Sequence, residues 1–215
     1  MKQQQPLTAP VKMPSEQILT FIDFQNDFVA PGGVLTFDNG KGDTALINRT
    51  RAFFQALPRG YFTNAIITLD THFSDTYAKS EERKSFPLHC VPQTKGWELA
   101  IDKKVIESKI PVVQYVRKNT YDMWAGTIDT VQCHIPSIKE VVLFGVASDI
   151  CNKAAVAGWL KRGVSVTILE DLTRGIYKQT ADVLKEEPFR CAVQNKQLKT
   201  ITAPAFLQRI QHERN

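Results

Sequence analysis

The chain has 215 residues, of which 43% are hydrophobic, and a formal net charge of +5. This length allows one domain with a sizeable core, and the basic residues are spread without a long run or interleaved aromatics, which argues against nucleic acid as a partner. No apolar run reaches membrane-spanning length, and the first residues lack the apolar core of a signal peptide, so we expect a cytoplasmic protein with no membrane partner.

Residues 1–15 are polar and rich in Gln and Pro, and are predicted to form a disordered leader, while residues 16–215 are predicted to form a single domain. The four cysteines, at positions 90, 133, 151 and 191, are widely spaced and contain no C-x-x-C pair. A chain of this size does not need disulfides to fold, so we expect reduced thiols.

Short β-branched runs alternate with helical patterns along the chain. Strands are expected at 18–23, 64–70, 110–116, 140–146 and 164–171, with a weak sixth strand near 198–202. Helices are expected over 42–58, 149–163, 179–188 and 203–215, and the longest irregular segment over 71–109. The alternation predicts an α/β fold: a doubly wound, Rossmann-like, mostly parallel sheet of five or six strands with helices on both faces.

The residues that follow the strands are the first candidates for a functional site, because ligands bind at the carboxyl ends of the strands in such sheets. The four leading strands deliver Asp23, then Asp70 with His72, then Lys118, and finally Cys151. The first strand of this topology lies centrally beside the fourth, so we expect Asp23 to face Cys151.

Cys151 is expected in the first turn of its helix, directly after "GVASDI". A helix N-terminus favours the thiolate and should lower the pKa of the thiol, as a nucleophile requires. Asp23 can act as the general base and acid of thiol chemistry, and Lys118 beside it would keep the carboxylate charged and orient it. A buried structural thiol, a turn aspartate and a solvated lysine are the alternatives for these three residues taken singly.

A candidate metal site begins with "LDTH". In an extended segment residues i and i+2 point the same way, so Asp70 and His72 can bind one ion, and His89 of "FPLHC" can return as a third ligand. Such ligands suit one divalent ion, with zinc expected and iron or manganese as alternatives, better than calcium. Glu81 or Glu82 could add a ligand directly or through water, and a purely structural role for the pattern stays open.

Four ordered motifs resemble those of the isochorismatase-like cysteine hydrolases, and within that family they are most similar to the nicotinamidases. The match runs from residue 18 to about 175 and rests on "FIDFQNDFVAPGGVL", "LDTH" with "FPLHCVPQTKGWEL", "RKNTYDMWAGT" and "GVASDICNKAAVAG". The resemblance implies a catalytic triad of Asp23, Lys118 and Cys151. It also implies a metal site formed by Asp70, His72 and His89.

The same resemblance implies a cis peptide bond before Ala147 and an oxyanion hole made by the backbone N–H groups of Ala147 and Cys151. The implied activity is hydrolysis of nicotinamide to nicotinate and ammonia through a thioester on Cys151, as a step of pyridine nucleotide salvage, by a homo-oligomer acting on a small-molecule amide. Phe28 is the residue expected to stack on the substrate ring.

Some positions differ from the usual nicotinamidase pattern. Phe86 replaces a tryptophan, Thr71 replaces an aromatic residue, and "YDMW" at 121–124 replaces a segment of small residues with a Phe. These differences predict a reshaped pocket wall with unchanged chemistry. The alternatives are therefore another amidase or carbamoyl hydrolase of the family and, as a different class, a non-catalytic binding protein on the same fold.

Overall fold

The computed structural model describes residues 16–125, 128–133 and 137–213, and the leader predicted over 1–15 lies outside the described residues. Within those ranges six strands form one sheet: β1 (Gln17–Ile22), β2 (Asn64–Asp70), β3 (Val112–Lys118), β4 (Glu140–Val146), β5 (Ser165–Arg174) and β6 (Leu198–Ile201). Their order is β3-β2-β1-β4-β5-β6, and every neighbouring pair is parallel. The predicted doubly wound sheet is confirmed, with β1 beside β4.

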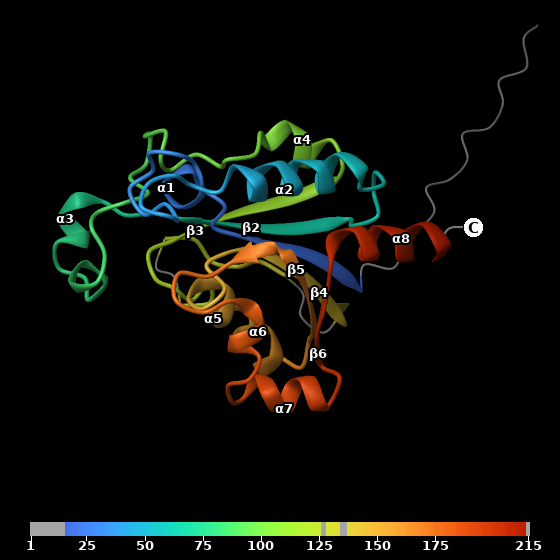
Figure 1. Ribbon diagram of the computed structural model, residues 1–215. Coiled ribbons are helices and arrows are strands. Elements are labelled where there is room, and N and C mark those ends of the chain that lie inside the picture. The colour runs from blue at the N-terminus through green and yellow to red at the C-terminus, as the bar shows by residue number, and fades with distance from the viewer. Residues whose placement is uncertain (1–15, 126–127, 134–136, 214–215) are drawn as a thin grey trace, which may run out of the picture.

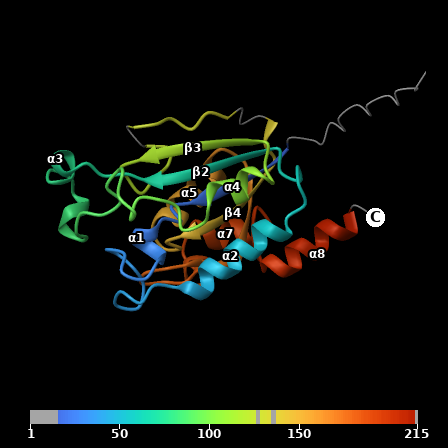
Figure 2. The same ribbon diagram turned by 90° about the horizontal axis from the view of Figure 1, so that it is seen from above.

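Helices cover both faces of the sheet (Figure 1). One face carries α2 (Thr44–Ala56), α4 (Lys103–Glu107) and α8 (Ala203–Glu213), and the other carries α5 (Cys151–Lys161), α6 (Thr180–Val183) and α7 (Phe189–Gln194). Figure 2 shows α2 and α8 as neighbours over the first face. Each face has its own apolar cluster, because alternate strand residues point to opposite sides: Leu19 and Phe21 join one cluster, Ile18 and Ile22 the other.

Short helical segments lie around the carboxyl edge of the sheet. They are α1 (Asn26–Val29), α3 (Ser74–Tyr77) and the 3₁₀ turn η1 (Glu82–Lys84). In Figure 1, α1 and α3 stand at the left, where the strands end. The segment 71–109, predicted to be irregular, therefore contains α3, η1 and α4, and the helix predicted over 179–188 ends at Val183. No helix in the described ranges is long and apolar enough to cross a membrane.

Candidate active site

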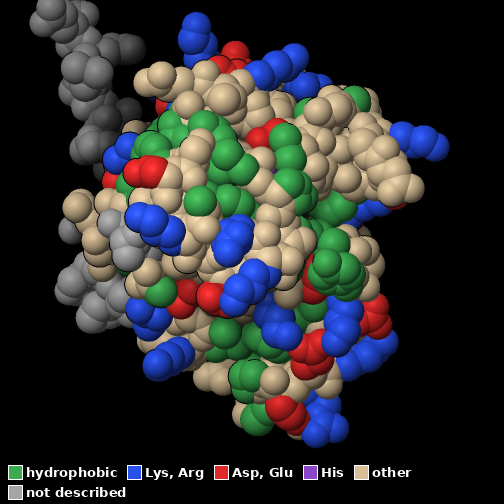
Figure 3. Space-filling view, turned by 90° about the vertical axis from the view of Figure 1, so that its left-hand side faces the viewer, with side chains coloured by type: hydrophobic (Ala, Val, Ile, Leu, Met, Phe, Trp, Pro, Cys, Tyr) green, Lys and Arg blue, Asp and Glu red, His purple; other side chains and the backbone are tan. Residues whose placement is uncertain are grey.

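A pocket of about 400 Å³ opens at the carboxyl edge of the sheet. Figure 3 views this edge and shows apolar side chains gathered near its centre. The lining residues come from the ends of the strands and from the loops beyond them: Phe28, Leu35, Phe37, Asp70, Glu82, Phe86, His89, Tyr121, Val146, Ala147, Ile150, Cys151 and Ile176. Polar groups with ligand or nucleophile chemistry thus meet an otherwise apolar wall.

Asp23 lies directly after β1 with a positive φ of 44°, a conformation that is uncommon for residues other than glycine. Thr68 on β2 fixes it at two points: the Asp23 backbone N–H donates to Thr68 Oγ1 over 3.1 Å, and that hydroxyl donates to Asp23 Oδ1 over 2.6 Å. The carboxylate is fully buried. It therefore presents its remaining oxygen, Oδ2, in a fixed direction.

Lys118, the last residue of β3, is a buried cation among the site's acidic groups. Its Nζ lies 2.6 Å from Asp23 Oδ2, 3.4 Å from Asp70 Oδ1 and 3.5 Å from Cys151 Sγ, and it donates to the Thr120 carbonyl over 3.0 Å. Burial would lower the pKa of Lys118, but the charges of Asp23 and Asp70 outweigh burial and raise it well above its usual value. The ammonium form is thus retained at neutral pH.

Cys151 is the first residue of α5 and is buried at the base of the pocket. Burial raises the pKa of its thiol well above the ordinary value; Lys118 opposes that rise, and the carboxylate and hydrogen bond of Asp23 add to it. The lowered thiol pKa expected from the helix start alone is therefore wrong for this site. Burial also raises the pKa of Asp23, against the opposing charge of Lys118. The thiol keeps its proton at rest and has a hydrogen-bonded carboxylate that can accept it.

The turn between β4 and α5 shapes the backbone next to the sulfur. The Val146–Ala147 peptide bond is cis, as the resemblance implied. Gly145 has a φ of 124°, and a Cβ there would lie 2.1 Å from the Ile22 carbonyl oxygen, so only glycine fits. Ala147 and Cys151 both line the pocket, and neither N–H donates to a backbone carbonyl among the turn and loop bonds of the described residues. These two N–H groups remain the candidate oxyanion donors.

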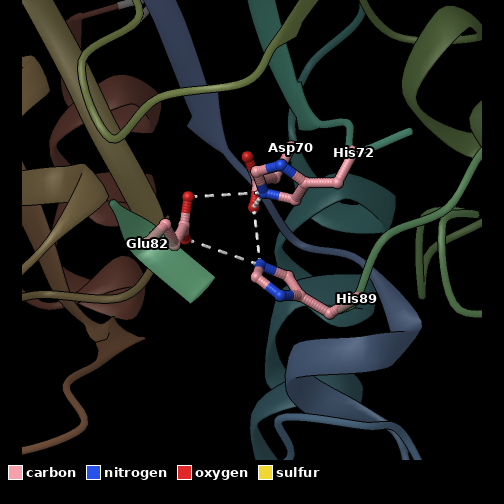
Figure 4. A group of neighbouring side chains, drawn as sticks. All are labelled: Asp70, His72, Glu82 and His89. Carbon is pink, nitrogen blue, oxygen red and sulfur yellow. Dashed lines mark hydrogen bonds and ion pairs between the residues drawn. The ribbon is translucent and has the colours of Figure 1, made fainter. Parts of the chain in front are cut away.

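Four side chains converge beside this triad to form a candidate metal centre (Figure 4). Asp70, His72, Glu82 and His89 each offer one ligand atom, and those atoms all lie within 4.8 Å of one another. Asp70 Oδ2 is 3.1 Å from His72 Nε2 and 3.0 Å from His89 Nε2, while the Glu82 oxygens lie 3.5 and 3.7 Å from the same two nitrogens. Two imidazole nitrogens and two carboxylates in one buried cluster fit a divalent transition metal.

The surroundings prepare these side chains as ligands. The Nδ1 of His89 donates to the Pro87 carbonyl over 2.8 Å, which directs Nε2 toward the cluster. Burial would raise the pKa of Asp70, but Lys118 and hydrogen bonds from the two histidines hold it well below its usual range. Of the two glutamates that the sequence left open, Glu82 lies in the cluster, whereas the side chain of Glu81 is 86% exposed and pairs with Lys84.

Two further residues position the candidate metal ligands, and the sequence analysis did not identify them. The Gln25 amide donates to the Asp70 carbonyl over 2.9 Å and accepts from the Asp70 N–H over 2.7 Å, so it pairs with the backbone of that ligand. The Asp27 carboxylate accepts the Cys90 N–H over 2.7 Å, next to His89. Polar residues at alternate positions in "DFQND" were the signal that could have found them.

The pocket wall agrees with the sequence predictions only in part. Phe28 and Phe86 both line it, and the Phe28 ring meets His89 edge to face with centroids 5.4 Å apart. Tyr121 is the residue of "YDMW" that reaches the pocket. The prediction that Thr71 and Trp124 reshape the wall is wrong: Thr71 accepts a hydrogen bond from the Trp97 indole in the interior, and Trp124 packs against Trp159.

Replacing Gln25 by Ala is expected to weaken metal binding by about 10- to 100-fold, because the backbone of Asp70 loses both of its fixing hydrogen bonds. Titration of the stripped protein with Zn²⁺ against a competing chelator measures the effect. Asn26→Ala is the matched control, since that neighbouring amide donates to the Lys95 carbonyl and contacts no ligand. His89→Ala, which removes a ligand, should bind more weakly still, and equal affinity in Gln25→Ala and the unmodified protein would contradict the positioning role.

Comparison with known proteins gives matches over most of the chain. A model described as the isochorismatase domain matches residues 17–189. An uncharacterized isochorismatase family protein, PncA of Bacillus subtilis, is 32% identical over 159 residues, covering 71% of this chain and 83% of that protein. The nicotinamidase of Saccharomyces cerevisiae is 26% identical over 193 residues, covering 74% of this chain and 88% of that protein. The crystal structure of Pyrococcus horikoshii pyrazinamidase in complex with zinc superimposes with a TM-score of 0.61 at 23% identity. The match covers 87% of this chain and 99% of that one.

Proposed function

This chain belongs to the isochorismatase family, and on that premise we propose that it is a cysteine-dependent nicotinamidase, which hydrolyses nicotinamide to nicotinate and ammonia. The observation that carries the proposal is the contact of Asp23, Lys118 and Cys151 at the base of a pocket that a four-ligand metal cluster also lines. Similarity to the yeast nicotinamidase supports the choice of substrate.

The geometry supports a two-stage mechanism. Asp23 accepts the thiol proton, and Cys151 Sγ attacks the carboxamide carbon, while the N–H groups of Ala147 and Cys151 donate to the developing oxyanion. Asp23 returns the proton to the amide nitrogen, ammonia leaves and a thioester remains. Asp23 then takes a proton from water as the water oxygen attacks the thioester carbon. The C–S bond breaks to release the acid, and Asp23 returns the proton to the departing sulfur, which restores the thiol. Lys118 keeps Asp23 oriented throughout.

The metal site would be formed by Asp70, His72, Glu82 and His89, and we propose zinc, with iron or manganese as alternatives. A divalent ion held there would supply Lewis acidity to the part of the pocket next to the triad. The mixed nitrogen and oxygen donors favour these metals over calcium, and the pyrazinamidase of Pyrococcus horikoshii was crystallised with zinc.

The pocket wall supports a neutral aromatic amide over a charged one. Among the described residues that line it there is no lysine or arginine, and its ionisable groups are those of the metal cluster, Cys151 and the Tyr121 phenol. A flat ring can pack against Phe28, Phe86 or Tyr121, whereas a substrate carboxylate would find no described lysine or arginine in the wall and would have to compete for the proposed metal ion. This favours nicotinamide over amides or carbamoyl compounds that carry a carboxylate. The homo-oligomer and the cytoplasmic location stay predictions.

Ammonia release by the purified protein tests the proposal. Nicotinamide, pyrazinamide, benzamide and a carboxylate-bearing carbamoyl amide are compared as substrates, each with metal-loaded and metal-stripped protein. The expected result is fastest release from nicotinamide with dependence on metal. Turnover confined to the carboxylate-bearing compound would favour the carbamoyl hydrolase alternative. No turnover of any amide by metal-loaded protein with an alkylatable thiol would favour a binding protein.

A further inference from the structure

One carboxylate beside the active site fixes a loop at the pocket rim. Asp149 lies in the turn between β4 and α5, two residues before Cys151. Its side chain accepts three consecutive backbone N–H groups: Ile176 donates to Oδ1 over 2.9 Å, and Tyr177 and Lys178 donate to Oδ2 over 2.7 and 2.9 Å. Hydrogen bonds to a charged acceptor are stronger than those between neutral groups, so the contact orders the whole loop.

The loop itself is a tight turn between β5 and α6. A Cβ at Gly175 would lie 1.9 Å from the Lys178 carbonyl oxygen, and the Gln179 side chain accepts the Gly175 N–H over 3.1 Å. These contacts set the shape of the loop but not its position on the molecule. Tyr177 at its tip is 76% exposed, so burial of its side chain contributes little to placing the loop, whereas Ile176 is 36% exposed and therefore partly buried. The three hydrogen bonds to Asp149 add to this partial burial.

Ile176 lines the pocket together with Cys151. Because Asp149 belongs to the turn that leads into Cys151, its hydrogen bonds fix the distance between the Ile176 wall and the sulfur. The segment is joined to the turn at two further points, one on each side of the loop. The Ser148 N–H donates to the Arg174 carbonyl over 2.9 Å, and the Thr180 hydroxyl donates to Ser148 Oγ over 3.2 Å. Neither bond involves residues 176–178.

We propose that Asp149 is a positioning residue that sets substrate fit by holding Ile176 at the pocket rim. This inference rests on the proposed amide hydrolysis for its kinetic readout. Asp149 contacts no reacting atom in this mechanism, so the effect should appear in substrate binding. Loss of the contact should free the loop, widen the pocket at Ile176 and leave the triad in place.

The kinetic test compares Asp149→Ala, Asp149→Asn and Ile176→Ala with nicotinamide as substrate. Asp149→Ala should raise KM about tenfold with kcat changed by no more than about twofold, as expected for a lost apolar pocket contact. Asp149→Asn retains one accepting oxygen, so its KM should lie between that of Asp149→Ala and that of the unmodified protein. In the double variant Asp149→Ala/Ile176→Ala, KM should match that of Ile176→Ala alone, because both changes remove the same wall.

A second readout does not depend on catalysis. Lys178 is exposed and supplies the last of the three fixed N–H groups, so limited trypsin cleavage after it reports loop order. Cleavage should be faster in Asp149→Ala and unchanged in the control Asp182→Ala, an exposed aspartate of α6 that pairs with Lys185. If Asp149→Ala fails to fold, Asp149→Asn is read by both measures.

The outcomes separate the two proposals. If trypsin cleaves Asp149→Ala faster but the unmodified protein hydrolyses no amide, the proposed function is overturned. The conclusion that the Asp149 contact orders the loop would then remain. Unchanged KM and cleavage in an active Asp149→Ala variant would overturn the positioning role. A fall in kcat with KM unchanged would also overturn it, since Asp149 would then act on the chemical step.

Discussion

Replacing Cys151 by Ala is expected to lower kcat for amide hydrolysis by about 10⁴-fold or more while the fold is retained. The side chain carries the sulfur that forms the proposed thioester, and no other described thiol lies in the pocket. Its removal leaves the α5 helix and its buried neighbours Ala155 and Trp159 in place. Ammonia release measures the loss, and a thermal unfolding curve checks the fold.

Cys191→Ala is the matched control, because Cys191 is an exposed free thiol on α7, away from the pocket. It should retain full activity. Substantial turnover by Cys151→Ala would show that the sulfur is not the nucleophile, and loss of activity in the Cys191 variant would point to damage unrelated to the site.

Replacing Lys118 by Met is expected to abolish activity and to lower the free energy of unfolding by about 3–5 kcal/mol. The change leaves the buried carboxylates of Asp23 and Asp70 without the cation that contacts both. Urea unfolding of the two proteins measures the difference. In the double variant Asp23→Asn/Lys118→Met part of the loss should be recovered, because one of the unpaired charges is gone. A double variant no more stable than Lys118→Met would contradict the ion-pair explanation.

The stability lost in Lys118→Met should depend on pH in a direction that follows from the pKa of Asp23. Burial already raises the pKa of Asp23 in the folded protein, and removal of Lys118 takes away the charge that opposes the rise. When the pKa of a carboxyl group is higher in the folded than in the unfolded protein, the folded state binds the proton more tightly. The free energy of unfolding therefore falls as the pH rises from the unfolded-state pKa through the folded-state pKa. The stability difference between Lys118→Met and the unmodified protein should therefore be largest at neutral pH and shrink as Asp23 is protonated.

The sheet could be predicted because parallel strands buried on both faces are continuous β-branched runs. The predicted bounds of β2 and β4 agree with the structure. The third strand was placed at 110–116, whereas β3 runs from Val112 to Lys118. Its apolar pattern ends at Val116, but pairing with β2 continues to Lys118 opposite Asp70. Backbone pairing at the strand end leaves no apolar signal in the sequence.

The helix predicted over 179–188 shows a limit of helical patterns. Val183 and Phe189 are both buried in the same apolar cluster. Six residues apart on a straight helix, they would point in widely different directions, so the chain must leave the helix for both to face the sheet. The end of the helix is therefore set by tertiary packing, and local helix propensity does not predict it. The helix α7 was missed for the same reason.

The sequence predicted those parts of the site that the sheet topology determines. Asp23, Lys118 and Cys151 come together because strand ends meet at one edge. Glu82 could not be separated from Glu81, since adjacent residues in a 3₁₀ turn point in different directions and the sequence does not give the turn's orientation. The thiol pKa was predicted from the helix start alone, but burial beside Asp23 and Asp70 decides its direction.

The metal ligands and the triad differ in how far apart their residues lie along the chain. The ligands lie between positions 70 and 89, whereas the triad joins positions 23, 118 and 151 and requires β1 to be inserted between β2 and β4. Contacts that close long loops form late in folding, because their entropic cost must be met first. During refolding the candidate metal ligands can therefore meet before Cys151 meets Asp23. On the proposed function, the return of hydrolysis would report the final closure of the sheet.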